Sequence, residues 1–326
     1  MEVDLMQQFL VQGAEVAALE DEFSSAADGR HAVAVASATS GLQLALLSLG
    51  IGAGEEVILP SFAPVETAAA VRRAGAVPVF ADIDPLTFCL DPEAVAAAIT
   101  PLTVAILPVH LFGHPAAVDQ ITDIAARHGL AIIEDATQAQ AATLAGRRVG
   151  TYGVLSVFAV EEGAVVTTEH PELAGAVKRL RDTAHAEARM ADGKASVGRG
   201  VLAKLAGAVA RQRANCRYLD SALTGVLVPY VEPGAHHVYH RYTVRIPGNG
   251  RPDRDAFAMA LAARGVQASV SIPTPVHRMP EYRSSSFLPR TEKAAGETLS
   301  LPVHPGLTEK ELERMATACN TLGGLL

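Results

Sequence analysis

Short apolar runs rich in β-branched residues alternate with segments of helical periodicity through the first half of the chain. The runs predict strands, and the segments between them predict helices. This alternation is typical of right-handed βαβ units that build a parallel sheet. The predicted strands are His31–Val35, Glu56–Leu59, Val77–Ala81, Val104–Val109 and Leu130–Ile133, and the predicted helices are Ser40–Leu49, Val65–Ala74, Asp91–Ile99 and Val118–Arg127.

The pattern changes after Gly150. Two apolar runs, Val154–Val160 and Ala164–Thr168, are separated by only three residues and predict a tight antiparallel hairpin. Two amphipathic helices follow, Pro171–Arg181 and Val201–Leu223. Beyond Pro229 the pattern predicts a small α+β domain with strands at Val238–Ile246 and Val266–Val270 and helices at Asp253–Ala263 and Thr308–Leu322. We therefore expect a large α/β domain over residues 1–200, and a long connecting helix with a small α+β domain over 201–326.

Composition narrows the class of protein. The 326 residues carry 27 basic and 35 acidic side chains, a formal charge of −8, which argues against nucleic-acid binding. Apolar residues make up 49% of the chain, enough for a large core, yet no run approaches the roughly 20 residues of a membrane span. The acidic start and three scattered cysteines indicate a cytoplasmic protein.

Two polar segments follow predicted strands. Ser37-Ala38-Thr39-Ser40-Gly41 places hydroxyls and free backbone amides at a helix N-terminus, where they either bind an anion or simply cap the helix. Glu134 and Asp135 end a strand at the edge where open α/β sheets bind ligands. A carboxylate there either orients a cationic nitrogen or caps the next turn.

Histidines give weaker signals. On a strand, His236 and His240 would lie roughly 13 Å apart, too far to share a metal ion, so a structural or substrate-facing role is favoured and no metal is expected. His110 and His277 each lie close to a proline, and a hydrogen-bonded structural role is the default for both.

Taken together, the segments resemble the DegT/DnrJ/EryC1/StrS family of sugar aminotransferases, which are pyridoxal-phosphate (PLP) enzymes of fold type I. The resemblance covers nearly the whole chain and rests on QGAEV (12–16), GEEVILPSF (54–62), PVHLFG (108–113), IEDATQA (133–139), GRRVGT (146–151) and HVYH (237–240). It implies an α/β fold with a mixed, mostly parallel sheet flanked by helices and a smaller C-terminal α+β domain.

The chain departs from the family pattern where the cofactor would bind. The family strand "CFSFYPTKNL" carries the Schiff-base lysine, whereas here Val157–Val160 runs directly into Glu161 and Glu162. The family spacing from Asp135 reaches Ala164, and the nearest lysine, Lys178, is expected on a helix surface. The resemblance also aligns Ala159 with a phosphate-binding serine, Pro64 with the aromatic that stacks on the ring, and Glu187 with an asparagine that reaches a neighbouring subunit's phosphate.

Part of the family site remains. The resemblance implies that Asp135 would face the pyridine nitrogen and Gln138 the ring hydroxyl, while Ser37 and Thr39 are retained on either side of Ala38. Because transamination needs an amine that carries the cofactor, we expect PLP binding to be lost and no cofactor to be present.

Three functions follow. The first is PLP-independent chemistry on a small-molecule intermediate in natural-product or amino-sugar biosynthesis. The second is a non-catalytic partner of an active aminotransferase paralogue, and the third is an ordinary PLP-dependent sugar aminotransferase. We expect a homodimer or a heterodimer with such a paralogue. The candidate catalytic residues are Asp135, His110, His185, Glu187, Glu161 and Glu162, and the candidate substrate-binding residues are Ser37, Thr39, Gln138, His240 and His277.

Overall fold

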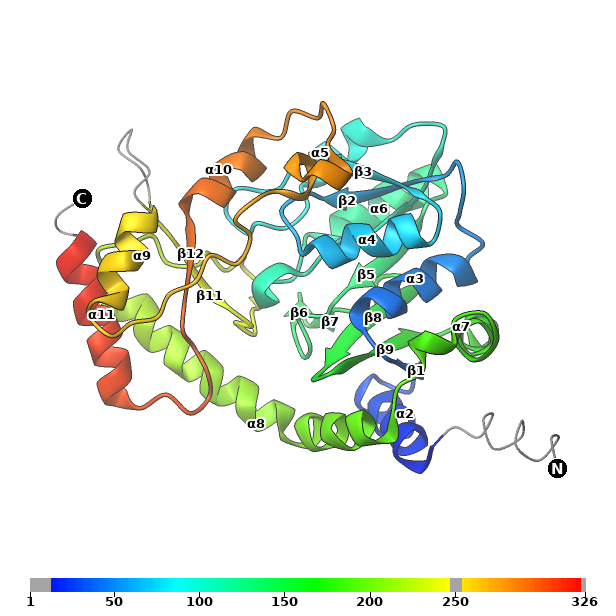
Figure 1. Cartoon of the computed structure of the whole chain (residues 1–326), viewed down its shortest axis with the longest axis horizontal. Helices are drawn as coiled ribbons and strands as arrows, with labels where there is room; N and C mark the ends of the chain where they lie inside the picture. Colours follow the sequence, from blue (N-terminus) through cyan, green and yellow to red (C-terminus); the bar gives the residue numbers. More distant parts are fainter. Residues whose placement is uncertain (1–12, 247–253, 324–326) are drawn as a thin grey trace.

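A seven-stranded mixed sheet forms the centre of the large domain (Figure 1). The computed structural model describes residues 13–246 and 254–323. The strand order is β1-β9-β8-β5-β4-β2-β3, and β9 alone runs against its neighbours. The strands are β1 (His31–Val35), β2 (Glu56–Pro60), β3 (Val77–Ala81), β4 (Thr103–Ile106), β5 (Ala131–Asp135), β8 (Leu155–Val160) and β9 (Gly163–Thr168).

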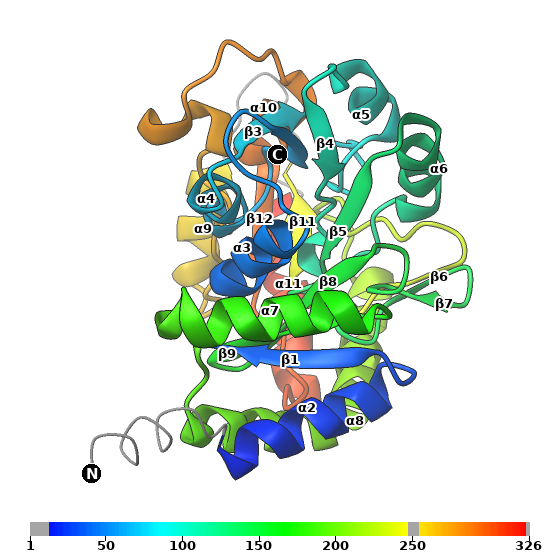
Figure 2. The ribbon, with the colours of Figure 1, turned by 90° about the vertical axis from the view of Figure 1, so that its right-hand side faces the viewer.

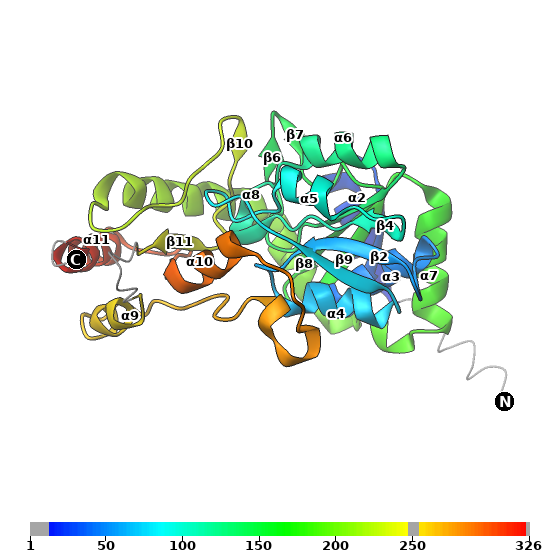
Figure 3. The same cartoon turned by 90° about the horizontal axis from the view of Figure 1, so that it is seen from above.

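Helices cover both faces of this sheet (Figure 3). One face packs against α3 (Ala38–Ser48), α4 (Val65–Arg73) and α7 (Pro171–Thr183). The other packs against α2 (Ala14–Ala26), α5 (Pro92–Ala98), α6 (Val118–His128) and the start of α8 (Asp192–Ala222). Side chains alternate between the two cores as the pleat requires: Val57 and Leu59 enter the first, and Ile58 the second.

The smaller C-terminal unit has its own core around Tyr242, Leu261 and Leu299. It contains the end of α8, α9 (Arg254–Ala262), α10 (Pro289–Glu297), α11 (Glu309–Gly323) and an antiparallel pair, β11 (Tyr242–Arg245) with β12 (Thr298–Leu301). A third sheet joins β10 (Ala235–His236) to the hairpin of β6 (Thr143–Leu144) and β7 (Arg147–Arg148). Short 3₁₀ turns occupy Leu111–Gly113, Ala186–Ala188, Val276–Arg278 and Pro280–Tyr282.

The sequence located most elements of the large domain, but several boundaries differ. α8 begins at Asp192 rather than at Val201, so the expected domain boundary at residue 200 falls inside a helix. The predicted strand Val238–Ile246 shortens to β11, and Val266–Val270 contributes a single bridge at Ser269. Gln12 and Asp253 lie outside the described residues.

The long helix α8 connects the two domains (Figure 1). Seen from the side, β1 lies between α7 and the paired helices α2 and α8 (Figure 2). No helix within residues 13–246 and 254–323 combines the length and apolar character needed to cross a membrane.

Candidate active site

A cavity of about 300 Å³ lies where the carboxyl ends of the parallel strands meet the small domain. Its polar lining is Glu66, Gln138, Arg241, Ser271 and Thr274, and we call it the strand-end cavity. Glu66 follows β2 and Gln138 follows β5, whereas the other three belong to the C-terminal region. An open parallel sheet binds ligands at this edge.

Asp135 is the last residue of β5 and is 2% exposed. Its Oδ2 accepts a hydrogen bond from Thr67 Oγ1 at 2.8 Å, and its Oδ1 accepts one from Thr137 Oγ1 at 2.6 Å and one from the Thr137 amide. Thr67 lies on α4, so two elements fix the carboxylate. A carboxylate with several fixed donors is well suited to orient a protonated ring nitrogen.

Gln138 is positioned by the turn after β4. Its Oε1 accepts the backbone amide of Phe112 at 2.9 Å, which leaves its NH₂ group available for a ligand in the cavity. Phe112 has a left-handed backbone with φ of 57°. The same turn bonds to the Val238–Arg241 segment, because the amides of Val238 and Arg241 donate to the carbonyls of Gly113 and Phe112.

Ser37, Thr39 and Ser40 surround the N-terminus of α3 and are half-buried. Ser37 caps this helix: its Oγ accepts the amide of Ser40 at 3.1 Å and also bonds the Ser40 hydroxyl at 2.9 Å. The helix N-terminus therefore has a cap and still presents hydroxyls and amides that suit a phosphate. The capping interpretation is therefore confirmed, and anion binding by this segment stays a prediction.

His110 lies apart from the cavity, in the protein interior. Its Nδ1 accepts the Ala116 amide, so Nε2 carries the proton and donates to Glu134 Oε2 at 3.0 Å. Glu134 also accepts the amides of Gly150, Tyr152 and Gly153. Burial raises the pKa of Glu134, but the hydrogen bonds from His110 and these amides outweigh it and hold the pKa below its ordinary value. This buried pair fixes a loop and has no access to a substrate.

His277 is also buried, where its Nδ1 bonds Ser61 Oγ at 2.7 Å and its Nε2 lies 3.4 Å from Glu292. His240 is exposed on the segment beside Gly113, and its backbone amide approaches that glycine closely. Neither contributes to the lining of the strand-end cavity.

The remaining candidates lie on surface turns. Glu161 and Glu162 form the exposed tip of the β8–β9 hairpin. The His185 and Glu187 side chains pair at 3.3 Å in a short 3₁₀ turn. The backbone of this turn bonds to the end of β1, because the Ala188 carbonyl accepts the Ala36 amide. The structure thus brings Asp135, Gln138 and the α3 hydroxyls to one edge of the sheet but spreads the other candidates over separate regions. Arg241 and Thr67 were not predicted, since nothing in their local sequence distinguishes them.

A model of the DegT/DnrJ/EryC1/StrS aminotransferase family matches residues 2–320. The chain belongs to this family. It is 37% identical to the dTDP-3-amino-3,4,6-trideoxy-alpha-D-glucose transaminase of Streptomyces venezuelae, over 94% of this chain and 86% of that protein. The structure of S. venezuelae DesV in complex with a ketimine intermediate superposes with a TM-score of 0.90 at 36% identity and covers 96% of this chain and 90% of DesV.

These matches confirm the expected family and the fold type I architecture. They also correct one expectation. DesV holds a ketimine intermediate, and Bacillus subtilis NtdA, 26% identical with a TM-score of 0.87 over 96% of this chain and 78% of NtdA, holds the bound cofactor PMP, the amine form of PLP. The expectation that no cofactor is present is therefore wrong, and the comparisons point to PLP. They give no support to PLP-independent chemistry.

Residues at the strand-end edge of the sheet fit the non-covalent parts of such a cofactor, although Asp135 and the N-terminus of α3 do not themselves line the strand-end cavity. Asp135 suits the ring nitrogen, and the N-terminus of α3 suits the phosphate. A covalent link is harder to place. The five lysines, all within the described ranges, lie on helices with exposed or half-exposed side chains: Lys178, Lys194, Lys204, Lys293 and Lys310.

Lys194 lies beside the β8–β9 hairpin, with its Nζ 3.7 Å from Glu162 Oε2 at the tip. Val157 is the residue opposite Asp135, and β8 continues for three more residues before the tip, roughly 10 Å along the strand.

Proposed function

We propose that this chain binds a pyridoxal-type cofactor non-covalently at the strand-end edge of the sheet, beside the strand-end cavity, and works in amino-sugar or natural-product biosynthesis. The observation that carries the proposal is the Asp135 carboxylate, buried at the end of β5 and fixed by Thr67 and Thr137. The names of the relatives, which include a sugar transaminase, support the biosynthetic role.

The reaction class follows because no lysine is placed to hold the cofactor covalently. In the amine form the cofactor carries its own nitrogen and needs no lysine to be retained. If bound, such a group would supply the amino group for a sugar ketone, while Asp135 would hold its ring nitrogen and the N-terminus of α3 its phosphate. Without a lysine to retain it, it would exchange with the solution as a second substrate does.

The lining of the cavity supports a sugar derivative as its ligand. Ser271, Thr274 and Gln138 offer hydrogen bonds to hydroxyl groups, and Arg241 offers a cation with no side-chain partner among the described residues. A guanidinium at the mouth of a cavity suits a phosphate ester. The proposed substrate is therefore a keto sugar that carries a phosphate or diphosphate group.

The test is an absorbance titration of the purified chain with PMP and with PLP, followed by borohydride reduction and intact mass measurement. We expect saturable binding of both forms and no reduced adduct on the protein. Asp135→Asn should weaken PMP binding about 10- to 100-fold, the loss expected for one charge-assisted hydrogen bond. Thr67→Val, which only loosens the carboxylate, should weaken it by less.

Two outcomes would contradict the proposal. A reduced adduct on any lysine would refute non-covalent binding, and the modified peptide would identify the lysine. Failure of both PMP and PLP to bind would refute the assignment of the cavity. Glu162→Gln is the matched control, because it alters an exposed carboxylate at the hairpin tip and should leave both titrations unchanged.

A second candidate is a subunit that completes its reaction beside a lysine-bearing relative. The two-residue turn between Val160 and Gly163 favours it, because this turn leaves no room for the loop on which the family carries its lysine. The test is co-expression with a lysine-bearing aminotransferase from the same genome. A mixed dimer in native mass spectrometry, with a turnover above the sum of the separate proteins, is expected; separate homodimers with additive rates would exclude it.

A further inference from the structure

A second cavity lies on the other side of the sheet from α3. It has a volume of about 410 Å³ and is lined mainly by apolar side chains, among them Phe23 of α2, Phe158 of β8 and Leu202 and Leu205 of α8. We call it the back cavity. Its volume lies within the range of ligand sites, which are typically apolar with a few placed polar groups.

Two polar atoms in the lining are buried without a partner. Arg30 Nε and Thr167 Oγ1 have no hydrogen bond within the part of the chain that the structure describes. Thr167 is fully buried and Arg30 is 5% exposed. Folded proteins leave few buried donors unpaired, since each costs about 1–3 kcal/mol.

The two atoms belong to neighbouring positions on one face of the sheet. Thr167 pairs with Ala32 across β1 and β9, and Arg30 precedes Ala32 by two residues, so both side chains point to the same side. Ser156, which pairs with Thr167 on its other flank, already donates to the Gly150 carbonyl. Among the described side chains that line the back cavity, the buried atoms without a hydrogen bond are therefore Arg30 Nε and Thr167 Oγ1.

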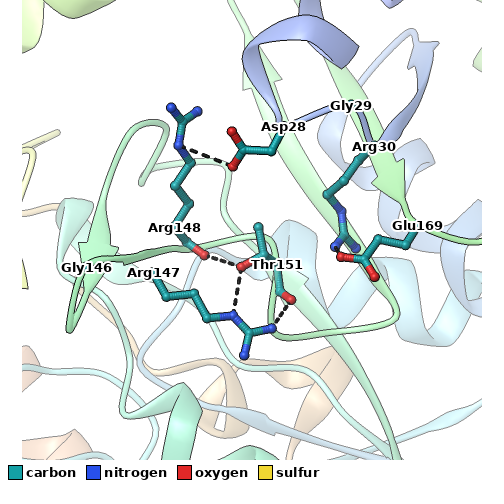
Figure 4. A pocket seen from close by; sticks show the side chains of 8 residues that line it. All are labelled: Asp28, Gly29, Arg30, Gly146, Arg147, Arg148, Thr151 and Glu169. Atoms are coloured by element: carbon teal, nitrogen blue, oxygen red, sulfur yellow. Dashed lines mark hydrogen bonds and ion pairs between the residues drawn. The ribbon is translucent and has the colours of Figure 1, made fainter.

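A cationic cleft of about 500 Å³ adjoins the back cavity, and the two share Arg30, Arg148 and Thr151 (Figure 4). Arg30 donates from one terminal nitrogen to Glu169 at 2.7 Å (Figure 4) and from the other to the Gly153 carbonyl, so neither bond uses Nε. Three arginines face two carboxylates in this cleft, which leaves it positive. Burial lowers the pKa of Arg30, and the Glu169 carboxylate opposes that shift.

We propose that the back cavity binds a small monocarboxylate with an apolar body. The carboxylate would accept from Arg30 Nε and Thr167 Oγ1, and the apolar body would lie between Phe23, Phe158 and α8. Arg30 Nε and Thr167 Oγ1 can both donate a hydrogen bond, so a ligand that pairs with them must be an acceptor. The positive charge of the adjoining cleft favours an anionic acceptor. The site is separate from the strand-end cavity and independent of the proposed function.

The test is calorimetric titration of the whole chain with 2-naphthoate. We expect saturable binding at one site per chain, and binding of the neutral 2-naphthamide at least tenfold weaker. Thr167→Val, which keeps the side-chain shape but removes the hydroxyl, should weaken naphthoate binding about three- to tenfold. Ala206→Phe should fill the cavity from a solvent-exposed lining position and abolish binding.

Stability in the absence of ligand gives a second, independent readout. Because the Thr167 hydroxyl has no partner in the fold, Thr167→Val should unfold at the same or a higher urea concentration than the parent protein. A markedly lower midpoint would mean that the hydroxyl is already satisfied and would overturn the proposal. Failure of naphthoate to bind would also overturn the proposal. So would binding to Thr167→Val and to Ala206→Phe that is as tight as binding to the parent protein. Asp135→Asn should leave naphthoate binding unchanged, which separates this site from the strand-end cavity.

Discussion

Replacing Glu134 by glutamine tests whether this buried carboxylate holds the loop before β8 in place. One oxygen accepts from His110 Nε2 and the Gly150 amide, and the other accepts from the amides of Tyr152 and Gly153. Every partner is a donor, because His110 Nδ1 is occupied as an acceptor. In either orientation of a glutamine, its NH₂ group would face two donors.

The expected cost follows from those two lost bonds. A hydrogen bond to a charged group contributes about 1.5–3 kcal/mol, and the side chain is 0% exposed, so solvent cannot replace it. Glu134→Gln should therefore lower the free energy of unfolding by about 3–6 kcal/mol, a large share of the 5–15 kcal/mol typical of a folded domain. Glu162→Gln, the same change at an exposed position, should cost less than about 0.5 kcal/mol.

Urea unfolding followed by circular dichroism measures both variants. The double variant with His110→Ala gives the coupling between the two side chains, which should exceed about 1 kcal/mol for a direct contact. A cost below about 1 kcal/mol for Glu134→Gln would refute the reasoning, because it would mean that the loop finds other acceptors.

Two further predictions concern stability. Gly150→Ala should lower the free energy of unfolding by about 3 kcal/mol, since its φ is 86° and a Cβ would collide with the Phe158 ring. Gly29→Ala is the control, with a φ of 80° and open space around it, and should cost only about 1 kcal/mol in the same urea assay. Burial holds the pKa of His237 well below its ordinary value, so below about pH 6.5 the unfolded chain binds more protons and stability falls as the pH drops. His237→Asn keeps an acceptor for the Tyr239 amide. Between pH 6.5 and 5.5 its free energy of unfolding should fall by up to about 1 kcal/mol less than that of the parent protein. An equal fall in both proteins would contradict this origin of the pH dependence.

The large domain was predictable because its strands are buried on both faces and read as continuous apolar runs. The start of α8 was not. Gly193, Gly198 and Gly200 lower helix propensity, yet the helix persists because it packs on α2, where Asp192 accepts the Val16 amide and Arg199 pairs with Glu15. Contacts between distant segments override local preference there.

The site was predicted in part. Asp135 and Gln138 occupy the edge that their position after a strand indicated. For His110 the sequence left a structural and a catalytic role open, because the choice depends on Glu134, which lies 24 residues away in the chain. The error about the cofactor had a different cause: the missing lysine and the altered positions Ala159, Pro64 and Glu187 were treated as loss of the whole site, although groups suited to the ring nitrogen and the phosphate remain on β5 and α3.

The length of α8 has a mechanical consequence. Its 31 residues span about 46 Å, and it packs on α2 at one end and on α11 at the other. Rotation by about 5° around the Asp192 end would carry Ala222 through about 4 Å. Since Arg241 and Ser271 face Glu66 and Gln138 across the domain junction, such a lever would widen or narrow the opening through which a ligand enters and leaves.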